Sequence, residues 1–183
     1  DHIQVDLGNV ANTEEAIAEI KRRLEGLELH ALVNNAAISP KTDGGKRLGS
    51  LETTLDDWHR VFQVNFFAPI MLARGLVEEL RTTRGSVVNV TSIAGSRVHP
   101  FAGTAYATSK AALAAAGIRV NAIAPGEIDT AILSPGTEKI VEQIPLQRLG
   151  TPDEVAKIIY VLCTETGSYV NGAEIHINGG QHV

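Results

Sequence analysis

The sequence has a single cysteine and no long apolar run. Cys163 has no second cysteine to pair with, so an internal disulfide is excluded. It lies in an apolar helical pattern, which favours a small buried hydrophobic side chain over a reactive thiol. No apolar stretch approaches the ~20 residues that span a bilayer. We therefore expect no membrane partner, and the cytoplasm is the expected compartment.

Signatures of several functional classes are also missing. The six histidines show no metal-ligand spacing. There is no Gly-x-Ser-x-Gly sequence of the kind that presents a hydrolase nucleophile. The net charge of -5 argues against a nucleic-acid partner, because such a surface needs a basic field. With 44% hydrophobic and 20% charged residues in 183, the chain has the composition of one globular domain.

Short apolar segments alternate with segments of helical periodicity. We expect strands at residues 3–6, 29–34, 86–90, 118–124 and 173–177. We expect helices from the N-cap Thr13 to about residue 24, at 55–80 with a break near Pro69, and at 104–116, 137–143 and 152–164. Continuous apolar strands that alternate with helices predict an α/β fold, with a parallel sheet covered on both faces.

Ligands of such sheets bind at the carboxyl ends of the strands. The residues that follow Asp6, Asn34, Val90 and Ala124 should therefore line a site. Each of these places carries unusual polar or turn residues, among them Asn34-Asn35, Thr91-Ser92 and Pro125-Gly126.

Tyr106 and Lys110 lie four residues apart, on one face of a predicted helix. A phenol has a pKa of about 10, and a nearby ammonium lowers it by favouring the phenolate. Tyr106 could then exchange a proton with a hydroxyl or carbonyl oxygen that Ser92 holds by a hydrogen bond. This spacing is common by chance, however, and a solvated helix face is the alternative.

The combination of motifs resembles the short-chain dehydrogenase/reductase family. Asn34-Asn35-Ala36-Ala37 is similar to that family's Asn-Asn-Ala-Gly motif, and Asn65, Ser92 and Tyr106-x-x-x-Lys110 follow in the family's order. Two further stretches look like family segments: Gly117-Ile-Arg-Val-Asn-Ala-Ile-Ala-Pro-Gly126 and Gly172-Ala-Glu-Ile-His-Ile-Asn-Gly-Gly180. The resemblance covers essentially the whole chain and implies a Rossmann-like, doubly wound parallel sheet.

The resemblance also implies roles for individual residues. Tyr106 would be the general acid/base, and Lys110 would lower its pKa and bind the nicotinamide ribose. Ser92 would orient the substrate oxygen, and Asn65 would hold a water in a proton relay to Lys110. Further contacts to NAD or NADP would come from Asp6 and Leu7 at the adenine, Asn34 and Ala36 at the ribose, and Pro125, Gly126, Ile128 and Thr130 at the nicotinamide, its carboxamide or the phosphates.

Each of these positions has a structural alternative. Asn34 could cap a turn, Asn65 could end a helix before Pro69, and Ser92 could be an ordinary loop hydroxyl. Jointly, the motifs favour an NAD(P)-dependent oxidoreductase that transfers a hydride between nicotinamide and a carbonyl or secondary alcohol. The alternatives are a non-catalytic dinucleotide-binding scaffold or regulator, and a literal truncated product that binds no dinucleotide.

The sequence departs from the family pattern in three places. Ala37 stands where the family usually has glycine, and no Gly-x-x-x-Gly-x-Gly loop occurs. In the family's sheet order 3-2-1-4-5-6-7, residues 3–6 would form strand three, so we expect a preceding strand-helix-strand segment in the physical protein. We expect a second seam at residues 114–117 within the single domain 1–183, because the helix that this one resembles is usually longer.

The resemblance implies a homo-oligomer, a dimer or tetramer, that pairs through residues 67–80 and 104–116. The substrate would be a small carbonyl compound or alcohol. Residues 39–50 and 128–137 should line its pocket, and Lys41, Lys46 and Arg47 could bind an anionic group there or simply be solvated.

Overall fold

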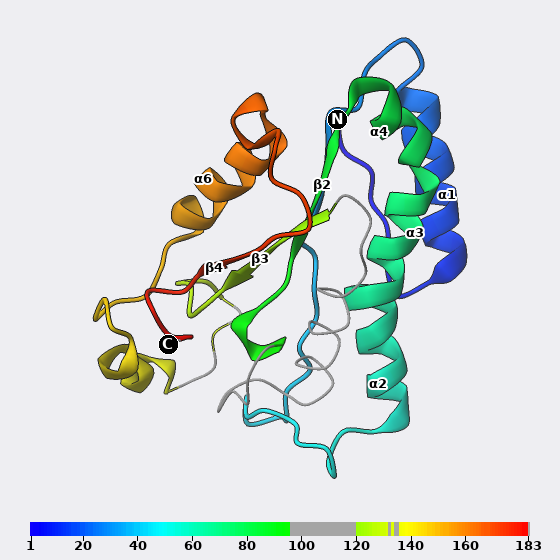
Figure 1. Ribbon diagram of the computed structural model, residues 1–183. Coiled ribbons are helices and arrows are strands. Elements are labelled where there is room, and N and C mark those ends of the chain that lie inside the picture. The colour runs from blue at the N-terminus through cyan, green and yellow to red at the C-terminus, as the bar shows by residue number, and fades with distance from the viewer. Residues whose placement is uncertain (96–119, 132, 134–135, 183) are drawn as a thin grey trace.

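The fold is a four-stranded parallel sheet between two layers of helices (Figure 1). The computed structural model describes residues 1–95, 120–131, 133 and 136–182. The strands follow one another in the order β1 (Ala31–Asn34), β2 (Ser86–Val90), β3 (Val120–Pro125) and β4 (Glu174–Ile177). Asn34 lies opposite Asn89, and Val90 lies opposite Ile123. The carboxyl ends of the strands therefore reach the same edge, as the sequence predicts.

Helices cover both faces of the sheet. On one side lie α1 (Val10–Arg23), α3 (Ala68–Gly75) and α4 (Val77–Thr83), and on the other lies α6 (Pro152–Cys163) (Figure 1). Strand β2 shows why two layers are needed. Val87 packs with Leu76 and Leu80 on one face, whereas the adjacent Val88 packs with Ile123 and Leu162 on the other.

The remaining elements are short. They are α2 (Leu55–Phe62), the π-helical turn η1 (Gln63–Phe67) and three 3₁₀ turns, η2 (Ile93–Gly95), η3 (Thr137–Gln143) and η4 (Glu165–Gly167). The helix expected at residues 137–143 is thus confirmed as a 3₁₀ helix. The helix expected at 104–116 lies outside the described residues.

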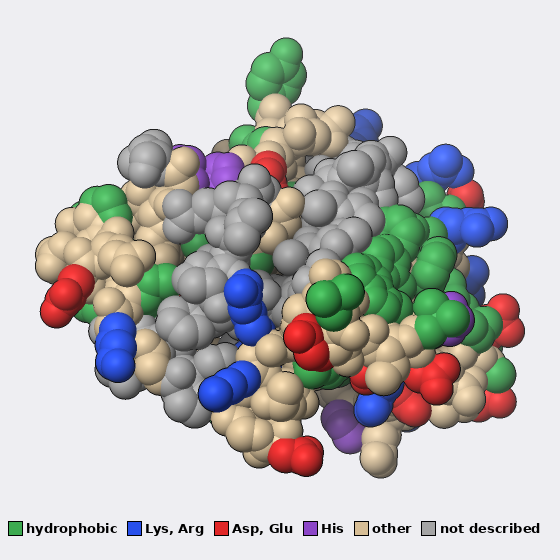
Figure 2. Space-filling view, turned by 90° about the horizontal axis from the view of Figure 1, so that it is seen from below, with side chains coloured by type: hydrophobic (Ala, Val, Ile, Leu, Met, Phe, Trp, Pro, Cys, Tyr) green, Lys and Arg blue, Asp and Glu red, His purple; other side chains and the backbone are tan. Residues whose placement is uncertain are grey.

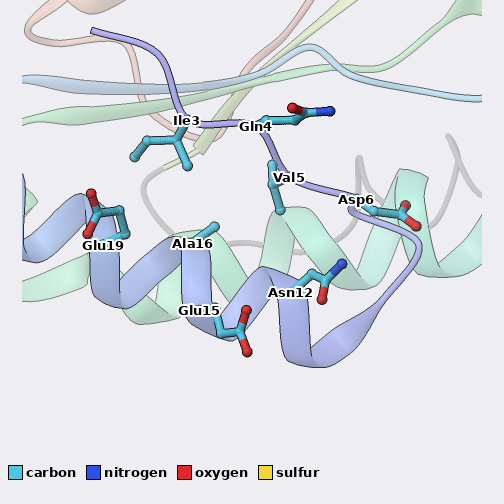
Figure 3. Close-up of a pocket in the computed structure, with 8 residues that line it drawn as sticks. All are labelled: Ile3, Gln4, Val5, Asp6, Asn12, Glu15, Ala16 and Glu19. Atoms are coloured by element: carbon cyan, nitrogen blue, oxygen red, sulfur yellow. The ribbon is translucent and has the colours of Figure 1, made fainter.

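The expected strand at residues 3–6 is wrong. This segment pairs with no strand in the described part of the chain, and a strand exists only through backbone bonds to a neighbour. Instead it runs alongside α1 and leaves a cavity of about 510 Å³ (Figure 3). In that view Ile3 and Val5 point toward the helix, and Ala16 faces them from its upper side. At the neighbouring sheet edge, Val33 of β1 is 40% exposed.

Helix α1 begins earlier than predicted. Its N-cap is Asn9, whose side chain accepts a hydrogen bond from the backbone N–H of Asn12. The expected cap, Thr13, lies inside the first turn, where its hydroxyl donates to the Asn9 carbonyl over 2.9 Å and is fully buried. Asn9 and Thr13 are both residue types that favour the N-cap position. Because Thr13 is buried, Asn9 caps the helix instead.

The long helical segment does not break at Pro69. Pro69 lies in the first turn of α3, directly after the π-helical turn, where its missing N–H costs little. The bend, of 58°, falls instead at Leu76 between α3 and α4. Within the described residues no single helix is long and apolar enough to cross a membrane. The bent pair 55–75 and 77–83 would qualify by length and composition alone, although its Leu76 and Leu80 belong to the core.

Helix α6 begins as the sequence predicts. Thr151 accepts a hydrogen bond from the Glu154 N–H, the Glu154 carboxylate accepts one from the Thr151 N–H, and Pro152 occupies the first turn. Buried Leu162 then fixes the helix against the sheet.

Candidate functional site

The carboxyl end of β1 is tied to β2 by two buried amides. Asn34, at the last position of β1, is 7% exposed and donates from Nδ2 to Oδ1 of Asn89 over 2.8 Å. This bond gives each buried amide one partner across the strand pair, as buried polar groups need. The loop that leaves Asn34 therefore starts from a fixed point at the sheet edge.

Asn65 holds the next part of that loop. Its Oδ1 accepts from the backbone N–H of Ile38 at 2.8 Å, and its Nδ2 donates to the Ile38 carbonyl at 3.0 Å. Asn65 is completely buried and lies in η1, the π-helical turn. Single π-helical turns often mark functional sites. Asn65 thus neither ends a helix nor faces solvent.

Ser92 follows β2 at the same edge. The preceding Thr91 anchors the strand end, because both its N–H and its hydroxyl donate to the Ile123 carbonyl of β3 at 2.8 Å. The half-buried Ser92 accepts from the backbone N–H of Ala94 through its Oγ at 3.2 Å. A hydroxyl that accepts in this way still has one O–H to donate.

The loop after β3 is fixed from two sides. The N–H groups of Gly126 and Glu127 donate to the Ile177 carbonyl at 3.0 Å and to Oε1 of Gln181 at 3.1 Å. On the other side, the N–H of Gly150 donates to the Glu127 carbonyl at 2.9 Å, and Ile128 bridges to Gly150. Pro125, at the end of β3, is buried. The loop is therefore a rigid wall of the site.

Two charged side chains, Lys41 and Glu127, interact electrostatically across the loops after β1 and β3. Glu127 is only 9% exposed, and its carboxylate acts on Lys41 of the loop after β1. Burial lowers the pKa of Lys41, and the attraction to Glu127 partly offsets that effect. Lys41 also faces Arg47 across a short antiparallel bridge. Of the three basic residues expected in this loop, Lys41 thus interacts with the loop after β3.

The remaining cofactor candidates are more exposed. Asp6 accepts from the Gly8 N–H at 2.9 Å, and the Leu7 carbonyl accepts from Nε2 of Gln63 in η1 at 3.4 Å. Ala36 is exposed, and so is Thr130, whose hydroxyl donates to the Ile128 carbonyl at 3.3 Å. Through Gln63, Leu7 is thus linked to the turn that carries Asn65.

Tyr106 and Lys110 lie outside the described residues, so the predicted tetrad is described for Asn65 and Ser92 alone. Seen from below in Figure 2, the described surface carries apolar, acidic and basic side chains. No group of three His, Cys, Asp or Glu side chains among the described residues could hold a metal ion.

Sequence reasoning missed two residues of this edge. Asn89 is a polar residue between Val88 and Val90 of β2, and that contrast was a usable signal for a buried amide partner. Gln181 follows the last strand and gave no signal, because its role depends on a turn that returns it to the Gly126 loop.

The chain was compared with families and with known proteins. A family model described as enoyl-(acyl carrier protein) reductase matches residues 1–182. Protein FixR of Bradyrhizobium diazoefficiens is 62% identical over 195 positions, which cover 100% of this chain and 70% of that protein. The 3-oxoacyl-[acyl-carrier-protein] reductase FabG of Aquifex aeolicus is 33% identical, and the match covers 97% of this chain and 75% of FabG.

Solved structures are similar as well. An oxidoreductase of the short-chain dehydrogenase/reductase family from Brucella ovis, in complex with a partially ordered NAD, is 62% identical with a TM-score of 0.82. The match covers 97% of this chain and 78% of that one. A 3-oxoacyl-[acyl-carrier protein] reductase with bound NAD from Brucella melitensis is 31% identical with a TM-score of 0.85, over 99% of this chain and 71% of that one.

Proposed function

Because the chain belongs to the short-chain dehydrogenase/reductase family, we propose that it transfers a hydride between a nicotinamide cofactor and a carbonyl or secondary alcohol. The observation that carries this proposal is the shared sheet edge. There Asn34 ends β1, Ser92 and the Gly126 loop follow β2 and β3, and Asn65 of η1 holds the loop after β1. Relatives with NAD bound at 62% and 31% identity support the choice of cofactor.

The described residues fit a dinucleotide. Ala36 is small and exposed, so a flat ring or a ribose can approach the backbone after the first strand. Gly126 has its missing Cβ directed toward Gln181 and Asn178, so the tight packing lies behind the loop. Asn34, Ala36, Pro125, Gly126, Ile128 and Thr130 would hold NAD or NADP, and Asp6 and Leu7 would lie at its adenine.

Ser92 and Tyr106 would act on the substrate oxygen. When bound, the nicotinamide supplies or accepts the hydride. In the reductive direction Ser92 donates a hydrogen bond to the carbonyl oxygen, and the Tyr106 phenol gives its proton to that oxygen. The ammonium of Lys110 favours the resulting phenolate and binds the nicotinamide ribose.

Asn65 would organise the proton path. Its amide fixes the backbone at Ile38, and its π-helical turn is the place where we propose that a water lies on a relay to Lys110. The Lys41–Glu127 pair would then form one side of the opening for the substrate.

We propose further that residues 1–183 belong to one nucleotide-binding domain that acts as a homo-oligomer. The alignment to FixR runs over 195 positions, more than the 183 residues of the chain, so FixR has residues inside the matched region that this chain lacks. This supports a seam within the chain, and we propose that it lies at 114–117, outside the described residues. Size-exclusion chromatography with light scattering tests the assembly, and a monomer would contradict it.

A panel of ketones, 3-oxoacyl thioesters and sugar alcohols tests the reaction with NAD(H) and NADP(H) on the full-length gene product. Turnover of nicotinamide, followed by its absorbance, is the expected result. The alternative is a dinucleotide-binding scaffold or regulator with the same fold. Tight binding of NADH by calorimetry without turnover on any substrate class would favour that alternative, and no binding at all would contradict both.

A further inference from the structure

Gln181 lies at the back of the loop that follows β3. Its side chain comes from the segment after β4 and is only 5% exposed. Its Oε1 accepts a hydrogen bond from the backbone N–H of Glu127 at 3.1 Å, in a buried environment. A side chain 54 residues away in sequence therefore holds the direction of this N–H.

A tight turn delivers Gln181 to this place. Asn178, which is 7% exposed, accepts from the Gly180 N–H through Oδ1 at 3.1 Å, and its carbonyl accepts from the Gln181 N–H at 3.1 Å. Gly179 and Gly180 have φ values of 62° and 91°, a region that glycine adopts at low cost. The turn is fixed from outside by Leu146, whose N–H donates to the Gly179 carbonyl at 3.2 Å.

The side chain of Gln181 also fills the volume beside Gly126. A Cβ at position 126 would overlap Oε1 of Gln181 and would lie 2.7 Å from Cβ of Asn178. The N–H of Gly126 is meanwhile held by the Ile177 carbonyl at 3.0 Å. The backbone of the loop at Gly126 and Glu127 is thus packed against the segment that follows β4.

We propose that Gln181 is a positioning residue for the nicotinamide-binding loop Pro125–Gly126–Glu127. The inference rests on the proposed function, in which this loop contacts the cofactor. Gln181 touches neither cofactor nor substrate. It satisfies one buried N–H and supports Gly126 from behind, and it thereby sets the position of the loop in advance of binding. Loss of that acceptor lets the Glu127 N–H turn toward another partner, and the loop must be reordered when cofactor binds.

Two substitutions in the full-length gene product separate this role from simple support of the fold. Gln181→Met keeps length and apolar contacts but removes the acceptor. Gln181→Glu keeps an oxygen acceptor but buries a charge, so it should be the less stable of the two in urea denaturation. Exposed Gln143→Met is the control.

Gln181→Met should raise the dissociation constant for NADH and the KM for the cofactor by about tenfold, the effect of one lost buried hydrogen bond, with the substrate KM within about twofold. Gln181→Glu should bind NADH more tightly than Gln181→Met although it is less stable. If Gln181→Met does not fold, Gln181→Asn, whose amide ends one carbon short of Glu127, should show the same cofactor defect.

Two results would overturn the inference. One is an unchanged NADH affinity in folded Gln181→Met, and the other is a cofactor affinity that follows stability, with Gln181→Glu the weakest. A wild-type protein that binds no nicotinamide cofactor would refute the proposed function itself. That outcome is distinguishable from failure of the Gln181 inference, because it is seen in the wild type without any variant.

Discussion

The side-chain amide of Asn65 forms hydrogen bonds with both the N–H and the C=O of Ile38, at 2.8 and 3.0 Å. One amide therefore replaces a strand partner for a residue that lies beyond the end of the sheet. This pairing fixes the loop after β1 to the helical layer, and it sets the distance between that loop and the proposed proton path.

Asn65→Ala should destabilise the fold and abolish turnover. The substitution leaves the N–H and C=O of Ile38 without their partner, at a cost of about 2 to 4 kcal/mol. Urea denaturation measures the loss. Asn171→Ala, at an exposed asparagine, is the control and should change stability by less than about 0.5 kcal/mol. Equal stability of the two variants would show that the Ile38 contacts contribute nothing.

Gly126→Ala should destabilise the loop after β3. The added Cβ meets Oε1 of Gln181 and the backbone of Asn178, both of which are packed, so overpacking should cost about 1 to 3 kcal/mol. Gly44→Ala is the matched control, because its nearest atom is Oγ1 of Thr42 at 3.9 Å. Thermal unfolding compares the stability of the two variants. If Gly126→Ala is as stable as Gly44→Ala, the turn that carries Gln181 must shift at little cost to accommodate the added Cβ.

The order of strands and helices could be predicted from sequence, because a strand that is buried on both faces has apolar residues in succession. Strand β2 is apolar at Val87, Val88 and Val90, and each helix layer accounts for one side of it. The N-terminal cap of α6 was equally readable, since Thr151 and Glu154 form a local motif within four residues. Local motifs and hydrophobic periodicity were therefore sufficient to predict most of the helices and strands.

Features that depend on distant partners could not be read in this way. The segment 3–6 has strand-like residues but no described neighbour to pair with. Thr13 has cap chemistry, but its burial against the core moved the helix start to Asn9. At the site, the family motifs pointed to Asn65 and Ser92, whereas the Asn34–Asn89 amide pair and the Gln181 contact arise only when separate strands meet.

Acid should weaken the start of α6. Hydrogen bonds from Arg148, and then from Thr151, lower the pKa of Glu154 from 4.5 to about 2. A carboxyl whose pKa is lower in the folded state contributes stability that is complete above pH 4.5 and is lost as the pH falls toward about 2.

Arg148→Met should therefore reduce the loss of thermal stability between pH 4.5 and about 2, because it removes the largest cause of the lowered pKa of Glu154. Melting curves by circular dichroism across that range measure the difference. Exposed Glu165→Gln serves as the control and should melt in parallel with the wild type. An unchanged acid dependence in Arg148→Met would contradict the role of the ion pair.

We propose that this chain carries an oxidoreductase site in which Tyr106 transfers a proton and the cofactor transfers a hydride. The most direct test is Tyr106→Phe in the full-length gene product, with NADH affinity and turnover on an active substrate measured side by side. We expect the affinity of Tyr106→Phe for NADH to stay within about threefold of wild type. Its turnover should fall by about a hundredfold or more, because only the general acid/base is lost. Turnover that survives in Tyr106→Phe would contradict the proposal.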